Sequence, residues 1–359
     1  MNILSISNFK NTSPLKNNKE QPIFTTAPKF GLTISKPLSK DTVSFGANLP
    51  TKKTCEDLKG ACSRITAKKI IQRHEAPHQK NINLFLNRFK GIISEKAGEA
   101  PLTLNHRIKT YFSLQLKTAS LGIGKSSIDE ILRIISDVSG ICIILEKPES
   151  YNLFVKGLNE MIKHGEINPI EVEYHRLPPK IKGKKLERTY DTLNPSTSQK
   201  LKNAIYKYKN PTYQLWSEVD SRSGYSGLHI TLQNSDGTKT EVQVITRPIA
   251  DLKYYENLYY KIRNGKPLDD KYQTIEPVLL PMKPLNLSNQ TETEKAVQKA
   301  LTKYSQEAYI YQIDNPHKNN FLKVSESKTL NAKEKKLIER FDFNKTKFLI
   351  DGAEKYAET

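Results

Sequence analysis

Two short β-rich runs joined by a tight turn constrain the fold of this chain more than any other feature of its sequence. The first run closes the stretch at residues 221–232, the second is residues 240–246, and Asp236-Gly237 lies between them. An Asp-Gly pair between two such runs predicts a β-hairpin. The chain is therefore expected to build a sheet that includes this hairpin.

The second run of the hairpin is expected to have two unlike faces. Side chains alternate along a strand, so Glu241 and Gln243 share one face while Val242 and Val244 share the other. A half-exposed strand with a solvated glutamate would show the same pattern. The hairpin alone does not distinguish such a strand from one that carries a site.

Helical patterns alternate with short apolar runs upstream of this hairpin. Apolar side chains at spacings of three and four between residues 82 and 93 predict a helix that covers a sheet. Further helices are predicted at residues 111–120, 127–136 and 151–167, and strands at residues 102–109, 141–145 and 170–175. The alternation predicts an α+β fold, a mixed β-sheet flanked by helices.

Four sequence fragments occur in a fixed order between residues 107 and 261. They are R-x-K-x-x-x-S-x-x-x-K from Arg107, D-x-x-G-I from Asp137, G-Y-x-x-L-H from Gly224 with a later E-x-Q, and E-x-x-x-Y-K from Glu256. Together they resemble the synthetase domain of the RelA/SpoT family, which carries N-G-Y-x-S-x-H and then E-x-Q-I-R-T. The resemblance covers less than half of the chain. It implies a nucleotidyltransferase-like domain, which we place at residues 55–265.

The resemblance implies an ATP-dependent pyrophosphotransferase of the GTP diphosphokinase kind. Such an enzyme transfers pyrophosphate from ATP to the ribose 3′-hydroxyl of GDP or GTP, which is alarmone synthesis in the stringent response. By the same resemblance the residues that bind the ATP triphosphate are Arg107, Lys109, Ser113 and Lys117. The alternative is that these residues form only the basic, solvent-exposed start of a helix and bind no nucleotide.

Two carboxylates are expected to form the catalytic centre. By the resemblance, Asp137 and Glu241 hold Mg²⁺, which prefers oxygen ligands and phosphates, and Glu241 also helps to draw the proton from the attacking hydroxyl. Tyr225 would stack on the acceptor base, and His229 and Gln243 would contact the acceptor. A carboxylate that only ends a helix is the structural alternative for Asp137.

The chain departs from the family pattern within these fragments. Cys142 and Ile245 replace two arginines, and Ser221 and Ser223 stand where the family has Lys and Asn. Arg222 and Arg247 lie close in sequence to the positions where the family's cationic side chains are missing. A one-residue step along a strand turns a side chain to the other face, so neighbours in sequence do not simply replace a lost cation.

A zinc-binding spacing occurs before these fragments. His74-Glu75-Ala-Pro77-His78 matches H-E-x-x-H, in which an unbroken helix puts both histidines on one face. Pro77 lies inside that turn and disfavours helix there, so we expect an interrupted helix with two surface histidines. The stretch has no His-Asp pair, which the hydrolase domain of the long RelA/SpoT enzymes uses to hold its metal, and no alarmone hydrolase is expected.

Composition limits the partners and the compartment. The formal net charge of +19 favours phosphate-bearing partners such as a nucleotide, tRNA or other RNA. Three cysteines at no metal-binding spacing argue against a disulfide scaffold and a cysteine zinc site. No apolar run has the length of a membrane span. A soluble, cytoplasmic protein is expected.

Three segments lie outside this pattern of helices and strands. Residues 1–50 have no sustained period and predict a disordered leader, and residues 266–359 predict a linker and a helical C-terminal extension. Residues 176–213 form a basic insert that ends in interleaved aromatic and cationic residues, a composition suited to nucleotides or single-stranded RNA.

Two alternatives to alarmone synthesis follow: pyrophosphorylation of the tRNA 3′ end, and a catalytically inactive nucleotide- or RNA-binding module.

Overall fold

The computed structural model describes residues 60–94, 98, 100–147, 150–176, 180–181, 184–185, 199, 201–203, 205–206, 215–221, 223–265, 289–316 and 318–358. The expected leader at residues 1–50 lies outside this part of the chain. So do Arg222, most of the basic insert and residues 266–288.

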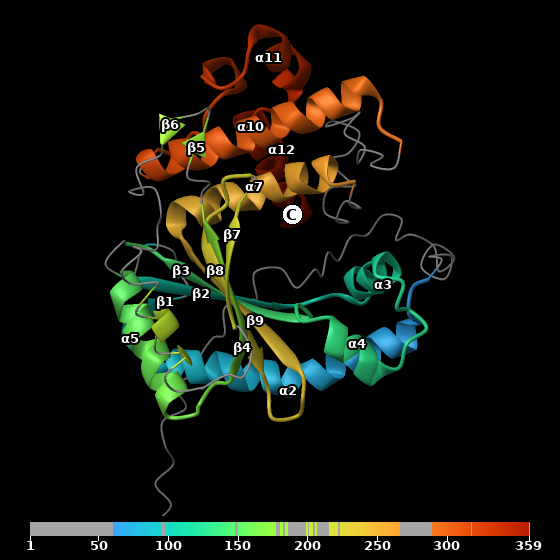
Figure 1. Cartoon of the computed structure of the whole chain (residues 1–359), viewed down its shortest axis with the longest axis vertical. Helices are drawn as coiled ribbons and strands as arrows, with labels where there is room; N and C mark the ends of the chain where they lie inside the picture. Colours follow the sequence, from blue (N-terminus) through green and yellow to red (C-terminus); the bar gives the residue numbers. More distant parts are fainter. Residues whose placement is uncertain are drawn as a thin grey trace, which may run out of the picture. The chain divides into compact units, whose positions relative to one another are not determined.

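A seven-stranded mixed sheet with the strand order β1-β2-β3-β9-β8-β4-β7 forms the centre of the fold (Figure 1). Its strands in chain order are β1 (Ile93–Ser94), β2 (Leu102–Ile108), β3 (Ser139–Leu145), β4 (Pro169–Arg176), β7 (Trp216–Asp220), β8 (Gly227–Gln233) and β9 (Lys239–Thr246). A separate two-stranded sheet consists of β5 (Lys180–Ile181) and β6 (Lys184–Lys185). The predicted α+β fold, with a mixed sheet flanked by helices, is confirmed.

The predicted hairpin is the pair β8 and β9. The two strands are antiparallel, and Gly237 takes a φ of 82° in the turn between them, a conformation that glycine adopts without steric cost. β9 also pairs in parallel with β3, so it lies between the first and second halves of the sheet. The hairpin therefore occupies the middle of the sheet and not its edge.

One face of the sheet is apolar and is covered by two helices. Val242 and Val244 of β9 belong to the same buried cluster as side chains of α2 (Arg64–Arg88) and α5 (Ser150–Lys163). Phe154 of α5 is fully buried there. Full burial of such a side chain stabilises the fold by about 1.5–3 kcal/mol, so this face supplies much of the driving force for folding.

Two short helices pack beside the ends of β2 and β3. Thr110 caps α3 (Tyr111–Ser120), and Ser127 caps α4 (Ile128–Ile134). Each cap side chain accepts a hydrogen bond from a backbone N–H in the first turn. Apolar side chains of α3 and α4 pack on the N-terminal half of α2, which fixes the segments that enter and leave the two strands.

The helix α2 continues through Pro77, so the expectation of an interrupted helix with surface histidines is wrong. His74 and His78 are both buried. Nδ1 of His74 lies 2.9 Å from the Ile70 carbonyl oxygen, and Nε2 of His78 lies 3.3 Å from Nδ1 of His106 on β2. Burial and the neighbouring His106 lower the pKa of His78 to about 4. Packing of α2 on the sheet offsets the cost of an internal proline, about 3 kcal/mol.

The other face of the sheet is apolar at one end, where the C-terminal helices cover it. Ile144 and Ile245 pack there in one cluster with α7 (Arg247–Arg263) and α10 (Glu292–Asp314). The remaining helical elements are η2 (Val324–Glu326), α11 (Ala332–Ile338), η3 (Glu339–Phe341) and α12 (Phe343–Glu358). No helix of the described residues is both long and apolar enough for a membrane span.

A buried ion pair within α7 lies where this helix contacts α10. Arg263 lies 2.5 Å from Glu256, and both side chains are 6% exposed. Arg263 also donates to the hydroxyl of Ser305 on α10 over 3.2 Å. An unpaired buried charge is costly, so Arg263 keeps Glu256 as its partner within α7, and its hydrogen bond to Ser305 links α7 to α10.

The helix α10 also contacts the loop before β8. Gly224 has a φ of 85°, and a Cβ atom at this position would lie 2.8 Å from the Cα of Gln306 and 3.3 Å from the Cβ of Tyr309. The glycine is therefore required twice, once for its backbone conformation and once for the approach of α10. The position of the Gly-Tyr loop depends on a helix that begins more than sixty residues later in the chain.

We predict that Gly224→Ala destabilises the protein by more than Gly237→Ala does. Both substitutions force alanine into a left-handed conformation, which costs about 1–2 kcal/mol. A Cβ at Gly237 meets nothing within 4 Å, whereas at Gly224 it overlaps α10, which adds about 1–3 kcal/mol. Urea unfolding of both variants measures the difference, and equal losses would contradict the contact.

Candidate functional site

Polar side chains occupy the rest of the sheet face that α7 and α10 cover at one end. The strand register places them in two adjacent rows. The first row contains Arg107, Gly140, Glu241 and Thr231, and the second contains Asn105, Cys142, Gln243, His229 and Glu173. Polar residues from five strand segments therefore meet on one surface.

Asp137 lies at one side of this surface, two residues before β3, and contacts two cations. Its Oδ2 is 3.1 Å from Nζ of Lys109 and 3.6 Å from Nζ of Lys117 on α3. Burial opposes ionisation of Asp137, but Lys109 and Lys117 outweigh it and lower its pKa. The carboxylate is therefore ionised at neutral pH. Ser113 lies one turn before Lys117 on the same helix.

The second oxygen of Asp137, Oδ1, is buried and accepts no hydrogen bond within the described residues. Buried carboxylate oxygens normally have a partner. Glu241 is close enough for its charge to act on the pKa of Asp137. An ionised carboxylate with one free oxygen, near a second carboxylate, suits Mg²⁺, which prefers oxygen ligands. Asp137 and Glu241 therefore fit the expected cation.

Arg107 extends across the sheet toward Glu241. It pairs with Gly140 in the register, and a Cβ on that glycine would contact the arginine side chain at 3.7 Å. Gly140 in turn pairs with Glu241 on β9. Because glycine has no side chain, Arg107 lies over it and its charge helps to lower the pKa of Glu241.

A chain of hydrogen bonds crosses the middle of the surface. The Tyr225 hydroxyl lies 2.8 Å from Nε2 of His229, whose Nδ1 lies 3.4 Å from Oε1 of Glu241. Gln243 donates to the other oxygen of Glu241 over 2.9 Å, and Lys253 donates to the amide oxygen of Gln243. The expected acceptor residues and the expected catalytic glutamate therefore form one connected network.

Glu241 has the most strongly shifted carboxyl of this network. Burial opposes its ionisation, but the hydrogen bond and charge of His229, with Arg107 and Lys253, lower its pKa to about 2. Its side chain is 18% exposed. The carboxylate is thus negative over the whole physiological range of pH.

Lys253 is a member of this surface that the sequence motifs do not indicate. It comes from α7, lies 5.2 Å from the ring centroid of Tyr225, and its charge acts on Cys142 and Glu241. Burial lowers its pKa. Its place is set by the packing of α7, for which no local sequence signal exists.

Arg247 does not take the place of the missing arginines. It lies at the end of β9 and pairs with Glu146, which also accepts a hydrogen bond from Thr103. It further pairs with Asp251 at 3.5 Å. Burial raises the pKa of the Cys142 thiol, and of the cations that act to lower this pKa, Lys253 has the largest effect, ahead of Arg107 and Arg247.

Comparisons with known proteins find similar chains among solved structures. No protein-family model and no curated protein matches the sequence. The small alarmone synthetase 1 from Bacillus subtilis, in its structure with the product pppGpp, matches at 12% identity and a TM-score of 0.36, over 68% of this chain and 93% of that chain. A GTP pyrophosphokinase family protein from Streptococcus pneumoniae matches at 14% identity and a TM-score of 0.31, over 67% of this chain and 96% of that chain.

We predict that stability depends on the ionisation of Glu241 in acid. Its folded pKa of about 2 lies below the ordinary value of 4.5, so its contribution is present above the ordinary pKa and is lost as pH falls toward the folded one. Relative to Glu241→Gln, the wild type should lose about 2 kcal/mol between about pH 5 and about pH 3. Chemical unfolding at both pH values measures this. A pH-independent difference between the two proteins would refute the shift.

Proposed function

We propose that this surface transfers pyrophosphate from ATP to the ribose 3′-hydroxyl of GDP or GTP. The observation that carries the proposal is that Glu241 lies on one sheet face with Asp137 at the edge of the same surface, Lys109 and Lys117 on one side and Tyr225 on the other. A reaction of this kind needs positioning and charge neutralisation more than covalent chemistry. The surface supplies both.

The side with Lys109, Lys117 and Arg107 would bind the ATP triphosphate. Lys109 and Lys117 both contact Asp137, and each can exchange that contact for a phosphate oxygen. Arg107 is exposed, so its guanidinium is accessible to a ligand. Ser113 on α3 would add a hydroxyl to this side.

Asp137 and Glu241 would hold Mg²⁺, which neutralises phosphate charge when bound. The free buried oxygen of Asp137 supports this assignment. A carboxylate with a pKa of about 2 takes a proton poorly and holds a cation well. We therefore propose that Glu241 acts mainly as a ligand of the cation and less as a base. Phosphoryl transfer through a loose transition state needs little help from a base.

The acceptor would bind on the side of Tyr225, His229 and Gln243. Tyr225 is held by its hydrogen bond to His229 and by edge-on contact with Tyr309 of α10, whose ring centroid lies 6.3 Å away. Lys253 adds a positive charge beside the tyrosine, where it can meet an acceptor phosphate. This cation supports nucleotide binding despite the two arginines that the motifs lack.

We predict that Asp137→Asn and Glu241→Gln each lower the rate of AMP release from ATP, in the presence of GDP or GTP, by at least about a hundredfold. Each change removes one negative charge and keeps the shape of the side chain. Glu171→Gln is the matched control, because Glu171 lies on β4 near Thr231 and outside the network. Near-normal turnover in both carboxylate variants would remove the basis of the proposal.

We predict that Tyr225→Ala raises the apparent KM for the acceptor by roughly tenfold or more and changes that for ATP less. Base stacking on an aromatic ring contributes about 1–3 kcal/mol. Tyr225→Phe keeps the ring and removes the hydroxyl that meets His229, so it should retain most of the acceptor affinity. Equal increases in both KM values for Tyr225→Ala would indicate a structural tyrosine.

A further inference from the structure

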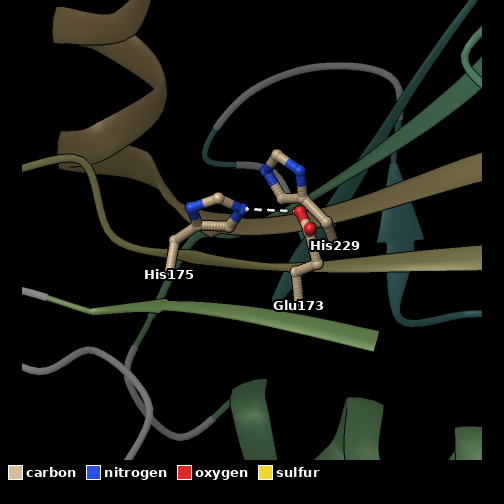
Figure 2. A group of neighbouring side chains, drawn as sticks. All are labelled: Glu173, His175 and His229. Carbon is tan, nitrogen blue, oxygen red and sulfur yellow. Dashed lines mark hydrogen bonds and ion pairs between the residues drawn. The ribbon is translucent and has the colours of Figure 1, made fainter. Parts of the chain in front are cut away.

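A group of ligand-type side chains lies at the β4 and β8 side of this surface. It consists of Glu173, His175 and His229 (Figure 2). Each offers a carboxylate oxygen or an imidazole nitrogen, and these atoms all lie within 4.8 Å of one another. Within the part of the chain that the structure describes, this is the group of His, Cys, Asp and Glu side chains close enough to hold a metal ion.

The strands themselves create the arrangement. Glu173 and His175 are two residues apart on β4 and so share a face of the sheet. His229 on β8 is the cross-strand partner of Glu173. The partner of His175 is Gly227, and the space that a side chain would fill there is taken by the Tyr225 hydroxyl and Ile245. Three ligand-type residues therefore project from a rigid part of the sheet.

The distances are close to those of a metal site. Nε2 of His175 lies 3.1 Å from Oε2 of Glu173, and the ring centroids of His175 and His229 lie 4.5 Å apart. Two ligand atoms on one tetrahedral zinc lie about 3.3 Å apart, given bond lengths of about 2.0–2.1 Å. Glu173 and His175 already have this separation. Rotation of the His229 side chain can bring its ring nitrogen to the same separation from the other two ligand atoms.

The surroundings also match a metal site. Metal-binding histidines usually keep a hydrogen-bond partner on the second ring nitrogen, which fixes the ring. His229 has two such partners, the Tyr225 hydroxyl at Nε2 and Glu241 at Nδ1, so one remains whichever nitrogen binds the ion. The histidine side chains are about one fifth exposed, and Glu173 is 40% exposed, which gives an ion a path from solvent.

We propose that Glu173, His175 and His229 bind a divalent transition metal, of which Zn²⁺ is the natural probe. Two imidazoles and one carboxylate suit zinc and related ions, whereas Mg²⁺ prefers an all-oxygen shell. Three protein ligands leave one coordination position for water or for an anionic ligand. The site is distinct from Asp137 and Glu241, and metal binding to the nucleotide-free protein tests it without any assumption about pyrophosphate transfer.

The consequence for the neighbouring surface follows from His229. This residue contacts Tyr225 and Glu241, and it must give up one of these contacts to bind the ion. Zn²⁺ and the acceptor nucleotide would therefore influence each other's affinity, and by linkage the effect is the same in both directions.

Titration calorimetry of the full-length, tag-free protein with Zn²⁺ tests the site, and Co²⁺ absorption reports the ligand geometry. We expect one Zn²⁺ per chain in the presence of excess Mg²⁺, and visible Co²⁺ bands typical of a four- or five-coordinate site. His175→Ala and Glu173→Gln should each weaken Zn²⁺ binding by at least about tenfold, since changes even in outer-shell partners have effects of this size. Circular dichroism confirms that each variant is folded, and Glu173→Gln keeps the side-chain shape.

His164→Ala is the control for adventitious binding. His164 is an exposed histidine that lies beside Glu160 and Glu166, away from β4 and β8, and its removal should leave Zn²⁺ affinity unchanged. Zn²⁺ binding that persists in His175→Ala and Glu173→Gln, or that disappears in His164→Ala, would overturn the proposal. So would complete displacement of Zn²⁺ by Mg²⁺ at equal concentration.

Discussion

The parallel pairing of β3 with β9 is the interaction on which the rest of this structure depends. It joins a strand from the first half of the fold to the hairpin strand, and its register sets Gly140 beside Glu241 and Cys142 beside Gln243. Parallel neighbours need a crossover connection, and here the connection contains α5, β4 and β8. The carboxylates Asp137 and Glu241 are therefore brought together by long-range pairing, and a one-residue slip would turn Glu241 into the apolar core.

One face of the sheet can hold many charged side chains because the other face is apolar and packs against helices. The face toward α2 and α5 is apolar and supplies the driving force for folding. The other face holds Asp137 against Lys109 and Lys117, and Glu241 against His229. Each carboxylate has partners that outweigh its desolvation, which is why both pKa values are lowered and not raised. The opposite charges of this surface therefore neutralise one another in the folded chain.

Local signals in the sequence predicted most strands and helices, and the alternation of side chains along β9 predicted that Glu241 and Gln243 share a face. The helix α3 and the hairpin strands follow directly from period, cap and turn residues. Features that depend on distant packing were not predictable. Lys253 reaches Gln243 only because α7 packs under α10, and α2 passes through Pro77 only because the sheet stabilises it. The contact of Gly224 with α10 likewise joins segments that are distant in the chain, and no local sequence pattern in either segment predicts it.

The reaction itself is tested most directly by following both products of one incubation. The full-length protein is mixed with Mg²⁺, ATP labelled in its β and γ phosphates, and GDP, GTP or bulk tRNA in separate reactions. We expect the label to move as an intact diphosphate to GDP or GTP and AMP to form in equal amount. Label on tRNA alone would contradict the choice of acceptor, and ADP with free phosphate, or no transfer to any acceptor, would contradict pyrophosphate transfer.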